Sequence, residues 1–285
     1  MASASLVVLK IAATILGVFI AVALAYPLIY IVAQALIGKP TVIISDLREL
    51  LVYGLTLSNF ERTLRDPEFY ESLVNTLIVA SITVVLSIAF IIPAAYAFSR
   101  FEFKGKDATL TYYLVVSQAG GGLGIIAVLA LYMFLVRMAA LGINLINIYV
   151  LPLIYTASQV PFQTWLMKSY FDQLPKELDE AAFIDGASWF HIIFRVIFPA
   201  SRAAFIIITL FAFMAAWGEF IIANLLGLKT LGMYIYTRAV AGQAGLMEPA
   251  TFAAASIVFA TPMIALFALS QKYIGEAYRL GIVKG

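Results

Sequence analysis

The chain contains no cysteine, a single histidine and few charged residues for its length. Of its 285 residues, 12% are Asp, Glu, Lys or Arg, against about 25% in an average soluble domain. The lack of cysteine excludes disulfides, thiolate metal sites and cysteine catalysis, and one histidine excludes a histidine-rich metal site. The net charge of +2 gives no indication of a nucleic-acid partner.

Apolar residues make up most of the remaining composition. They account for 63% of the chain, and the mean hydropathy is +0.99. Such a composition excludes a disordered chain, because disordered segments are polar and charged. It also argues against a water-soluble domain and indicates an integral membrane protein.

Long uncharged intervals predict where the chain crosses the membrane. A helix needs about 20 apolar residues to span a hydrocarbon core of about 30 Å. The first apolar run continues to Ile37, well past the about 7–15 residues of a signal-peptide core, so we expect a retained span. The sequence predicts an all-α membrane protein with six transmembrane helices, near residues 11–36, 73–98, 109–136, 148–167, 203–228 and 252–272.

The distribution of basic residues predicts the orientation of these spans. With the N-terminus inside, the inner segments carry 11 of the 18 Lys and Arg residues. The short loop 99–108 is the clearest case, with Arg100, Lys104 and Lys106. Because basic residues accumulate on the cytoplasmic side, we expect both termini to be inside. We expect residues 1–72 to form the first span with an outer amphipathic segment, and residues 73–285 a five-helix core that contains a long inner loop, 168–202.

The inner loop has the pattern of a short capped helix from Pro175 to Gly186. Proline is favoured at a first helical position, carboxylates such as Glu177 and Glu180 suit the first turns, and glycine readily ends a helix. Ser188 is expected to cap a second helix over 189–198. One narrow face of the first helix, at i, i+3, i+4 and i+7, consists of Leu178, Ala181, Ala182 and Asp185. Such a face fits a groove on a partner; the alternative is an ordinary surface helix.

The same loop resembles the EAA loop of ABC-importer permeases. In that family the pattern is roughly EAA, three residues, G, nine residues and I-x-L-P. The chain matches it at residues 180–182, Gly186 and Pro199, while Val196 and Phe198 replace the usual Ile and Leu. Further blocks resemble the MalG-like sugar-permease branch, at residues 100–105, 141–143, 175–182, 184–188, 217–220 and 283–285. The third span lacks the proline that is usual in relatives.

The resemblance implies a MetI-like permease fold and an ATP-driven carbohydrate importer that works by alternating access. The implied partners are a second MalG- or MalF-like permease, two cytoplasmic ABC ATPase subunits and an extracellular solute-binding protein, in the cytoplasmic (inner) membrane of a prokaryote. The short loop helix would be the coupling helix in a cleft of the ATPase. Its expected coupling residues are Leu178, Glu180, Ala181, Ala182, Asp185 and Gly186.

No catalytic role is expected for this chain itself. It has no G-x-x-x-x-G-K-[ST] phosphate loop, so ATP and Mg are expected in the partner ATPases, and no cofactor or metal here. A membrane-embedded enzyme would need paired acids or metal ligands at membrane depth, which the sequence does not offer. The alternative function is an ion-coupled secondary transporter with Glu219 as the coupling acid.

Polar and small residues within the spans are candidates for the substrate path. Glu219 is expected to face the bundle interior, water or a partner, because a carboxylate in lipid is costly. It is either a pathway residue or a structural hydrogen-bonding group. The glycines of the third span either bend a helix that lines the path or allow close helix packing. The path candidates are Gln118, Gly120, Gly122, Gly124, Trp217, Glu219 and Asn224.

The outer loop between the last two spans is the candidate contact for the binding protein. It is rich in glycine and carries Arg238, Gln243 and Glu248. In the resembling family the equivalent loop touches the solute-binding protein. The alternative is a plain linker.

Overall fold

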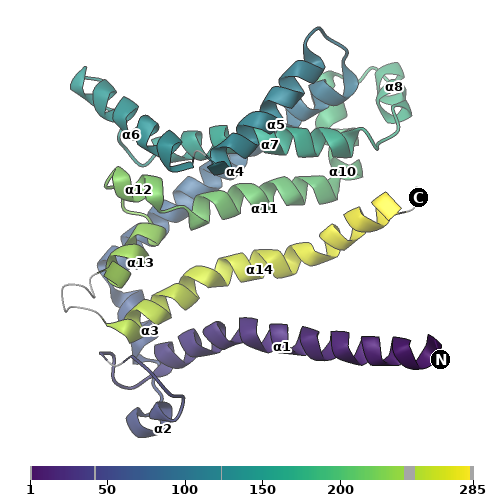
Figure 1. The fold of residues 1–285 in the computed structure, drawn as a ribbon. Coiled ribbons are helices and arrows are strands. Elements are labelled where there is room, and N and C mark those ends of the chain that lie inside the picture. Colours follow the sequence, from purple (N-terminus) through teal and green to yellow (C-terminus); the bar gives the residue numbers. More distant parts are fainter. Residues whose placement is uncertain (1, 42, 123, 241–247, 283–285) are drawn as a thin grey trace. The chain divides into compact units, whose positions relative to one another are not determined.

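A computed structural model describes residues 2–41, 43–122, 124–240 and 248–282 (Figure 1). The elements in these ranges are helices, and β-pairing there is limited to an isolated bridge between Ile37 and Leu55. The chain divides into two compact units, which are described separately. The first is Met1–Tyr70 with Ile235–Thr261, and the second is Glu71–Tyr234 with Pro262–Gly285.

The first unit is built around the end of a long apolar helix. It contains α1 (Ala2–Leu36), α2 (Glu49–Tyr53), α3 (Ser58–Arg65) and parts of α4 (Pro67–Arg100), α13 (Leu231–Val240) and α14 (Pro249–Ile282). From Leu9 onward α1 is apolar on all sides and largely exposed, as expected of a helix that faces lipid. At its end, Ala35 packs with Ala253 and Ala254 of α14, because small residues let helix backbones approach closely.

A buried amide closes the C-terminal end of α1. Asn59 of α3 is fully buried, and its Nδ2 donates to the carbonyl oxygens of Ala35 and Ile37, both at 2.9 Å. The last carbonyls of a helix have no partner within the helix. Asn59 supplies one, which fixes α3 against the end of α1.

The second unit contains the remaining helices. They are most of α4, then α5 (Lys106–Gly122), α6 (Gly124–Ala140), α7 (Val150–Phe171), α8 (Glu177–Ile184), α9 (Trp189–His191), the π-helix η1 (Ile192–Ile197), α10 (Phe198–Ala200), α11 (Arg202–Gly218) and α12 (Ile221–Leu225). One of its cores lies where α4, α7 and α11 meet the loop 168–202. This cluster includes Ile92, Phe171, Ala182, Ile197 and Ile208. The loop 168–202 therefore packs against the ends of three long helices (Figure 1).

Four of the six predicted spans are long and apolar enough to cross a membrane. In the described part of the chain these are Leu9–Leu36, Pro67–Arg100, Arg202–Leu225 and Pro249–Gln271. They correspond to the predicted first, second, fifth and sixth spans. The fourth predicted span is a helix, α7, with 22 residues, but polar side chains lower its hydropathy. Gln163 is buried there and donates to Gln159 of the same helix.

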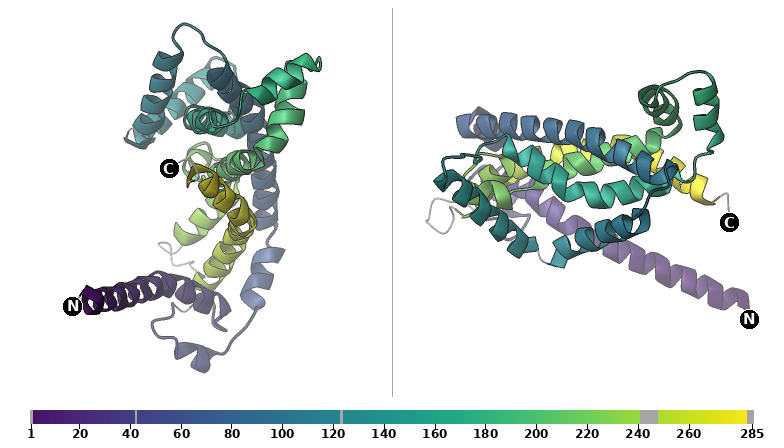
Figure 2. Two further views of the ribbon diagram at one scale, coloured as in Figure 1. Left: turned by 90° about the vertical axis from the view of Figure 1, so that its right-hand side faces the viewer. Right: turned by 90° about the horizontal axis from the view of Figure 1, so that it is seen from above.

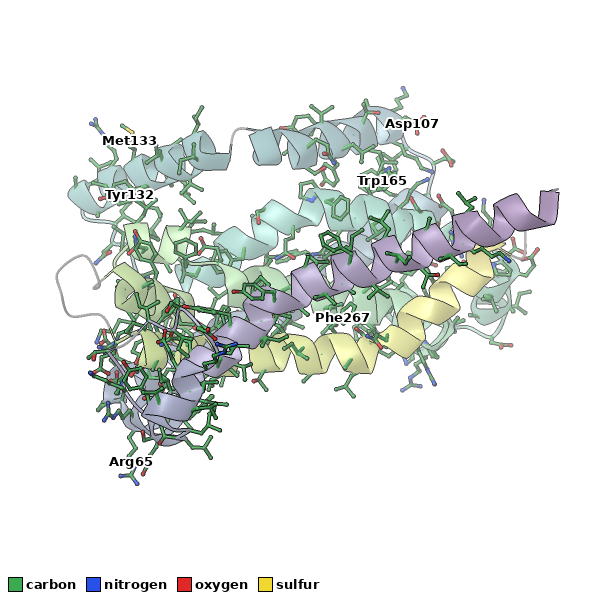
Figure 3. The ribbon with its side chains drawn as sticks, turned by 60° about the horizontal axis from the view of Figure 1, so that its bottom comes forward. Arg65, Asp107, Tyr132, Met133, Trp165 and Phe267 are labelled. Carbon is green, nitrogen blue, oxygen red and sulfur yellow. The ribbon has the colours of Figure 1, made fainter. Side chains whose placement is uncertain are left out.

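The predicted third span, 109–136, is described on both sides of residue 123, which lies outside the described residues. Two helices of 17 residues each lie here: α5 ends at Gly122, and α6 begins at Gly124. The two helices run in different directions (Figures 1 and 2). Glycine lowers helix stability by about 1 kcal/mol relative to alanine, so four glycines within 120–124 favour an interruption. Apolar side chains of α6 such as Met133 are exposed (Figure 3).

Candidate functional site

The predicted coupling helix is α8, and its end has the geometry that the sequence predicted. It begins at Glu177, two residues after Pro175, which is the start that the sequence predicts. Gly186 has a φ of 78°, in the left-handed region that favours glycine. The Gly186 N–H donates to the Phe183 carbonyl and the Ala187 N–H to the Ala182 carbonyl, both at 3.0 Å. This pair of bonds is the Schellman motif, which satisfies the last carbonyls of the helix.

The two sides of α8 differ in exposure. Asp179 and Ala182 are buried, at 6% and 8% exposure. Glu180, Ala181 and Asp185 are exposed, as is Leu178. The predicted small-residue face is therefore divided. Ala182 packs into the core of its own unit, and the expectation that its side chain faces a partner does not agree with this placement.

The buried side of α8 is held by the last turn of α4. The Arg100 Nε lies 2.6 Å from Asp179 Oδ2, and the two side chains are only 7% and 9% exposed. The Tyr96 hydroxyl donates to Asp179 Oδ1 at 2.8 Å. A further Arg100 nitrogen donates to the Leu174 carbonyl at 3.3 Å. We call Tyr96, Arg100 and Asp179 the α4–α8 clamp. The sequence analysis missed it, because the partners are 79 positions or more apart.

Aromatic side chains adjoin the clamp. The ring of Trp189 lies 4.3 Å from that of Phe183 and 5.0 Å from that of Phe101, measured between centroids and in edge-on geometry. Such pairs contribute about 0.5–1.5 kcal/mol each beyond their burial. A cavity of about 150 Å³ opens beside them and is also lined by Lys176 and Glu180.

The second loop helix starts as predicted and then departs from α-helical geometry. The Ser188 side chain accepts the His191 N–H at 3.4 Å, which caps the helix. The His191 side chain also contacts this residue, with its Nδ1 at 2.8 Å from the Ser188 hydroxyl oxygen. The predicted helix over 189–198 comprises α9, η1 and the start of α10, so its central turns are π-helical. Such turns often occur at functional positions.

Glu219 caps a short helix within the interrupted fifth span. It has extended backbone geometry, with φ −79° and ψ 131°, between α11 and α12. Its carboxylate accepts the Ile222 N–H at 2.7 Å and the Tyr155 hydroxyl at 2.5 Å. Half-buried Asn224 follows within α12. These contacts favour the structural interpretation of Glu219 over the pathway interpretation.

The other path candidates lie in different surroundings. Trp217 is 1% exposed and stacks on Phe213 at 5.1 Å, so its side chain belongs to the core. Gln118 is exposed on α5. Gly120 and Gly122 lie in the last turns of α5, and Gly124 begins α6. A Cβ added at Gly124 would meet no atom within 4 Å, so close packing within this chain does not explain that glycine.

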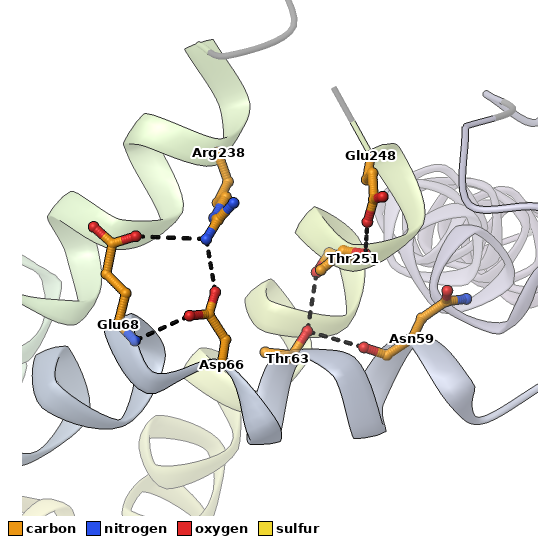
Figure 4. Close-up of polar contacts among 7 residues, drawn as sticks. All are labelled: Asn59, Thr63, Asp66, Glu68, Arg238, Glu248 and Thr251. Atoms are coloured by element: carbon orange, nitrogen blue, oxygen red, sulfur yellow. Dashed lines mark hydrogen bonds and ion pairs between the residues drawn. The ribbon is translucent and has the colours of Figure 1, made fainter. Parts of the chain in front are cut away.

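Two of the three binding-protein candidates line one cavity in the first unit. Arg238 pairs with Asp66 at 2.6 Å and lies 3.5 Å from Glu68, while Glu248 accepts the Thr251 hydroxyl at 2.8 Å (Figure 4). Arg238, Glu248 and Thr251 line a cavity of about 330 Å³. Gln243 lies outside the described residues. Over the described ranges, no group of three or more His, Asp or Glu residues is placed to hold a metal ion.

Comparison with known families identifies the chain. Residues 73–279 match the family described as "Binding-protein-dependent transport system inner membrane component". The chain belongs to this family. It is thus the integral membrane permease of an ABC importer and not an enzyme, because ATP hydrolysis belongs to separate ATPase subunits. Because the chain belongs to this family, the alternative of an ion-coupled secondary transporter is rejected.

Individual relatives match over most of their length. The trehalose/maltose transport system permease protein MalG of Thermococcus litoralis is 32% identical, over 98% of both chains. The maltodextrin permease MdxG of Bacillus subtilis is 30% identical over 81% of both. The fold is similar to that of a chain in a bacterial ABC transporter involved in alginate import, with a TM-score of 0.68, 24% identity and coverage of 92% of this chain and 95% of that one.

Proposed function

We propose that this permease imports a mono-, di- or oligosaccharide across the cytoplasmic membrane of a prokaryote. A sugar substrate is supported by the names of three relatives, which are permeases of transport systems for trehalose and maltose, maltodextrin, and galactooligosaccharides. The proposed complex contains a second permease, two ATPase subunits that bind ATP and Mg, and an extracellular solute-binding protein. A solved relative of the fold was crystallised with a periplasmic protein bound to an alginate pentasaccharide.

One observation carries the coupling role that we propose for α8. The helix is capped, ended by Gly186 and buried on one side, so that it presents Glu180, Ala181 and Asp185 outward on a fixed support. A partner that closes on this surface moves a rigid element instead of deforming a mobile loop. In the proposed cycle, ATP binding closes the ATPase dimer, the coupling helices move, and the path changes its accessible side.

The proposed topology has six spans with both termini inside. The short helices α5 and α6 would together supply the third crossing, and α7 the fourth, each covered by neighbouring helices or the second permease. The proposed domains are residues 1–72 and the core 73–285. The outer residues Arg238, Gln243 and Glu248 would contact the binding protein, and Gln118 with the glycines of α5 and α6 would border the path.

Reconstitution tests the transport function. The permease, its second permease, the ATPases and the binding protein are placed in vesicles and assayed for uptake of maltose, trehalose, maltotriose, a galactooligosaccharide and an alginate oligosaccharide. We expect ATP-dependent uptake of at least one sugar. Absence of uptake for the whole panel, with an intact complex, would contradict the sugar assignment.

Substitutions in α8 test the coupling role. Glu180→Lys reverses a charge on the exposed side, and Gly186→Pro removes the left-handed turn that ends the helix. Both are expected to abolish uptake while the protein still inserts. Glu102→Lys is the matched control, because Glu102 is exposed in loop 99–108 and pairs with nearby Lys106. Normal uptake in both α8 variants would refute the coupling assignment.

A further inference from the structure

The α4–α8 clamp is unlike the other ion pairs of the inner side. The pairs Glu102–Lys106 and Lys168–Asp172 join residues four positions apart, and at least one side chain of each is well exposed. The clamp joins residues 79 positions apart with both charges buried. A buried pair adds little net stability, because desolvation offsets the attraction, but loss of one partner leaves a costly unpaired charge. The clamp therefore fixes geometry more than it adds stability.

A second set of contacts lies at the opposite end of α4. Lys229 Nζ lies 2.7 Å from Glu71 Oε2, and the Asn75 side chain donates to the Lys229 carbonyl at 2.9 Å. The Leu231 N–H donates to the Thr76 hydroxyl oxygen at 2.7 Å, in a buried position. These bonds attach α4 to Lys229, between α12 and α13, and to Leu231, the first residue of α13. All of these residues belong to the second unit.

A single helix thus connects the two sets of contacts. α4 has 34 residues, which corresponds to about 50 Å at 1.5 Å per residue. Pro93 removes one backbone hydrogen bond from it, but the flanking Ile92 and Ala95 are fully buried in the core cluster. That core restrains the helix where proline would weaken it.

We propose that Tyr96, Arg100 and Asp179 are positioning residues for transport, which make α4 the rigid connection between the coupling helix and residues 229–231. Movement of α8 is carried through the clamp to α4 and along it to the segment that follows α12. The proposal rests on the coupling role proposed for α8. It adds the residues inside this chain that convert docking of the ATPase into movement at the other end.

The first test measures coupling in the complete transporter. Asp179→Asn keeps the shape of the side chain and an acceptor for Tyr96, but it leaves Arg100 without its counter-charge. With the panel sugar that the unchanged transporter carries fastest, we expect the number of sugar molecules carried per ATP to fall about tenfold, in the range found for mutations that alter coupling. The ATPases should still co-purify. Merely structural damage would lower hydrolysis and transport together.

The second test measures the position of α8 without any sugar. Because the chain has no cysteine, Ile184→Cys creates a single labelling site, and Ile184 is 86% exposed on α8. A nitroxide at this position, in the full chain in lipid nanodiscs, should become more mobile when Asp179→Asn is added. The label reports on the clamp whether or not the sugar assignment is correct.

Matched variants complete the design. Glu102→Gln removes an exposed ion pair next to the clamp and should leave both measurements unchanged. Tyr96→Phe removes one hydrogen bond and should lower the transport ratio less than Asp179→Asn; it replaces that variant if Asp179→Asn fails to insert. Arg100→Lys keeps the charge, so it should carry more sugar molecules per ATP than Arg100→Gln.

The two proposals fail in different ways. If the unchanged transporter shows no ATP-dependent uptake, the proposed function fails, and the nitroxide still tests the clamp. If uptake is normal but Asp179→Asn carries as many sugar molecules per ATP as the unchanged chain, or leaves the label equally immobile, the positioning role is overturned.

Discussion

Glu219 shows how a single carboxylate is accommodated in an otherwise apolar segment. It interrupts the fifth span and accepts hydrogen bonds from the Ile222 backbone and the Tyr155 hydroxyl. The first N–H groups of a helix lack partners within the helix, so a side-chain acceptor stabilises the start of α12. A group with these contacts needs no role in ion coupling to account for its presence.

This interpretation predicts different effects for two substitutions. Glu219→Ala removes the acceptor and should lower the free energy of unfolding by about 1–2 kcal/mol. Glu219→Gln retains an acceptor oxygen and should cost less than half as much, with uptake close to that of the unchanged protein. Thermal melting in detergent and vesicle uptake measure the two effects. A Gln variant that is stable but inactive would show that the charge itself is needed in the path.

At the scale of the element, the contacts of α4 differ in what they join. Thr76 and Thr83 lie on the same helix and are both buried, at 1% and 0% exposure. Thr76 accepts the Leu231 N–H from a distant segment. Thr83 donates to the Val79 carbonyl of its own helix at 2.7 Å. That carbonyl retains its backbone partner when the hydroxyl is removed, whereas the Leu231 N–H loses its acceptor.

Replacement of each threonine by valine separates the two kinds of hydrogen bond. Thr76→Val should lower the free energy of unfolding by about 1–3 kcal/mol, because a buried N–H is left unsatisfied. Thr83→Val is the matched control, and its effect should be much smaller. Melting of both variants in the same detergent gives the comparison. Equal losses would mean that the Leu231 bond does not hold the far end of α4.

At the scale of the whole molecule, the orientation in the membrane is the prediction with the widest consequences. Coupling through α8 requires the inner loop to lie on the ATPase side, which is the side that the basic residues indicate. The cysteine-free chain permits a direct measurement, because each introduced cysteine is the only one present. Leu57, before α3, and Lys104, after α4, are both exposed and lie beyond opposite ends of a predicted span.

Single cysteines at these two positions should react differently in intact cells. A membrane-impermeant maleimide should label Leu57→Cys from outside and leave Lys104→Cys unlabelled until the membrane is permeabilised. Labelling of Lys104→Cys in intact cells would show that the orientation is the reverse of the predicted one. In that case α8 would not lie on the ATPase side. Expression of each variant is checked by labelling after permeabilisation.

Features set by local sequence were predictable from the sequence. The lengths of the apolar runs predicted the first, second, fifth and sixth spans. A charged residue is costly in lipid, so a long uncharged run marks a segment that can cross the membrane. The short loop helix and its end at Gly186 follow from nearby residues, since carboxylates favour the first turns and glycine adopts a positive φ without strain. The glycines of 120–124 predicted a weak point in the third span, and this is where α5 ends and α6 begins.

Features that depend on long-range contacts were decided only by the tertiary structure. The sequence grouped Leu178, Ala181, Ala182 and Asp185 by helical period, but period alone does not say which side of a helix meets the core. Packing against α4 and α7 buries Ala182 and Asp179 and leaves Glu180 outward. The pairing of Arg100 with Asp179 and of Tyr155 with Glu219 likewise joins positions far apart in the chain. The sequence by itself therefore determined which segments are helical and apolar, because those properties are local. Which side of α8 is free to meet a partner was decided by the fold, because burial depends on what distant helices place against it.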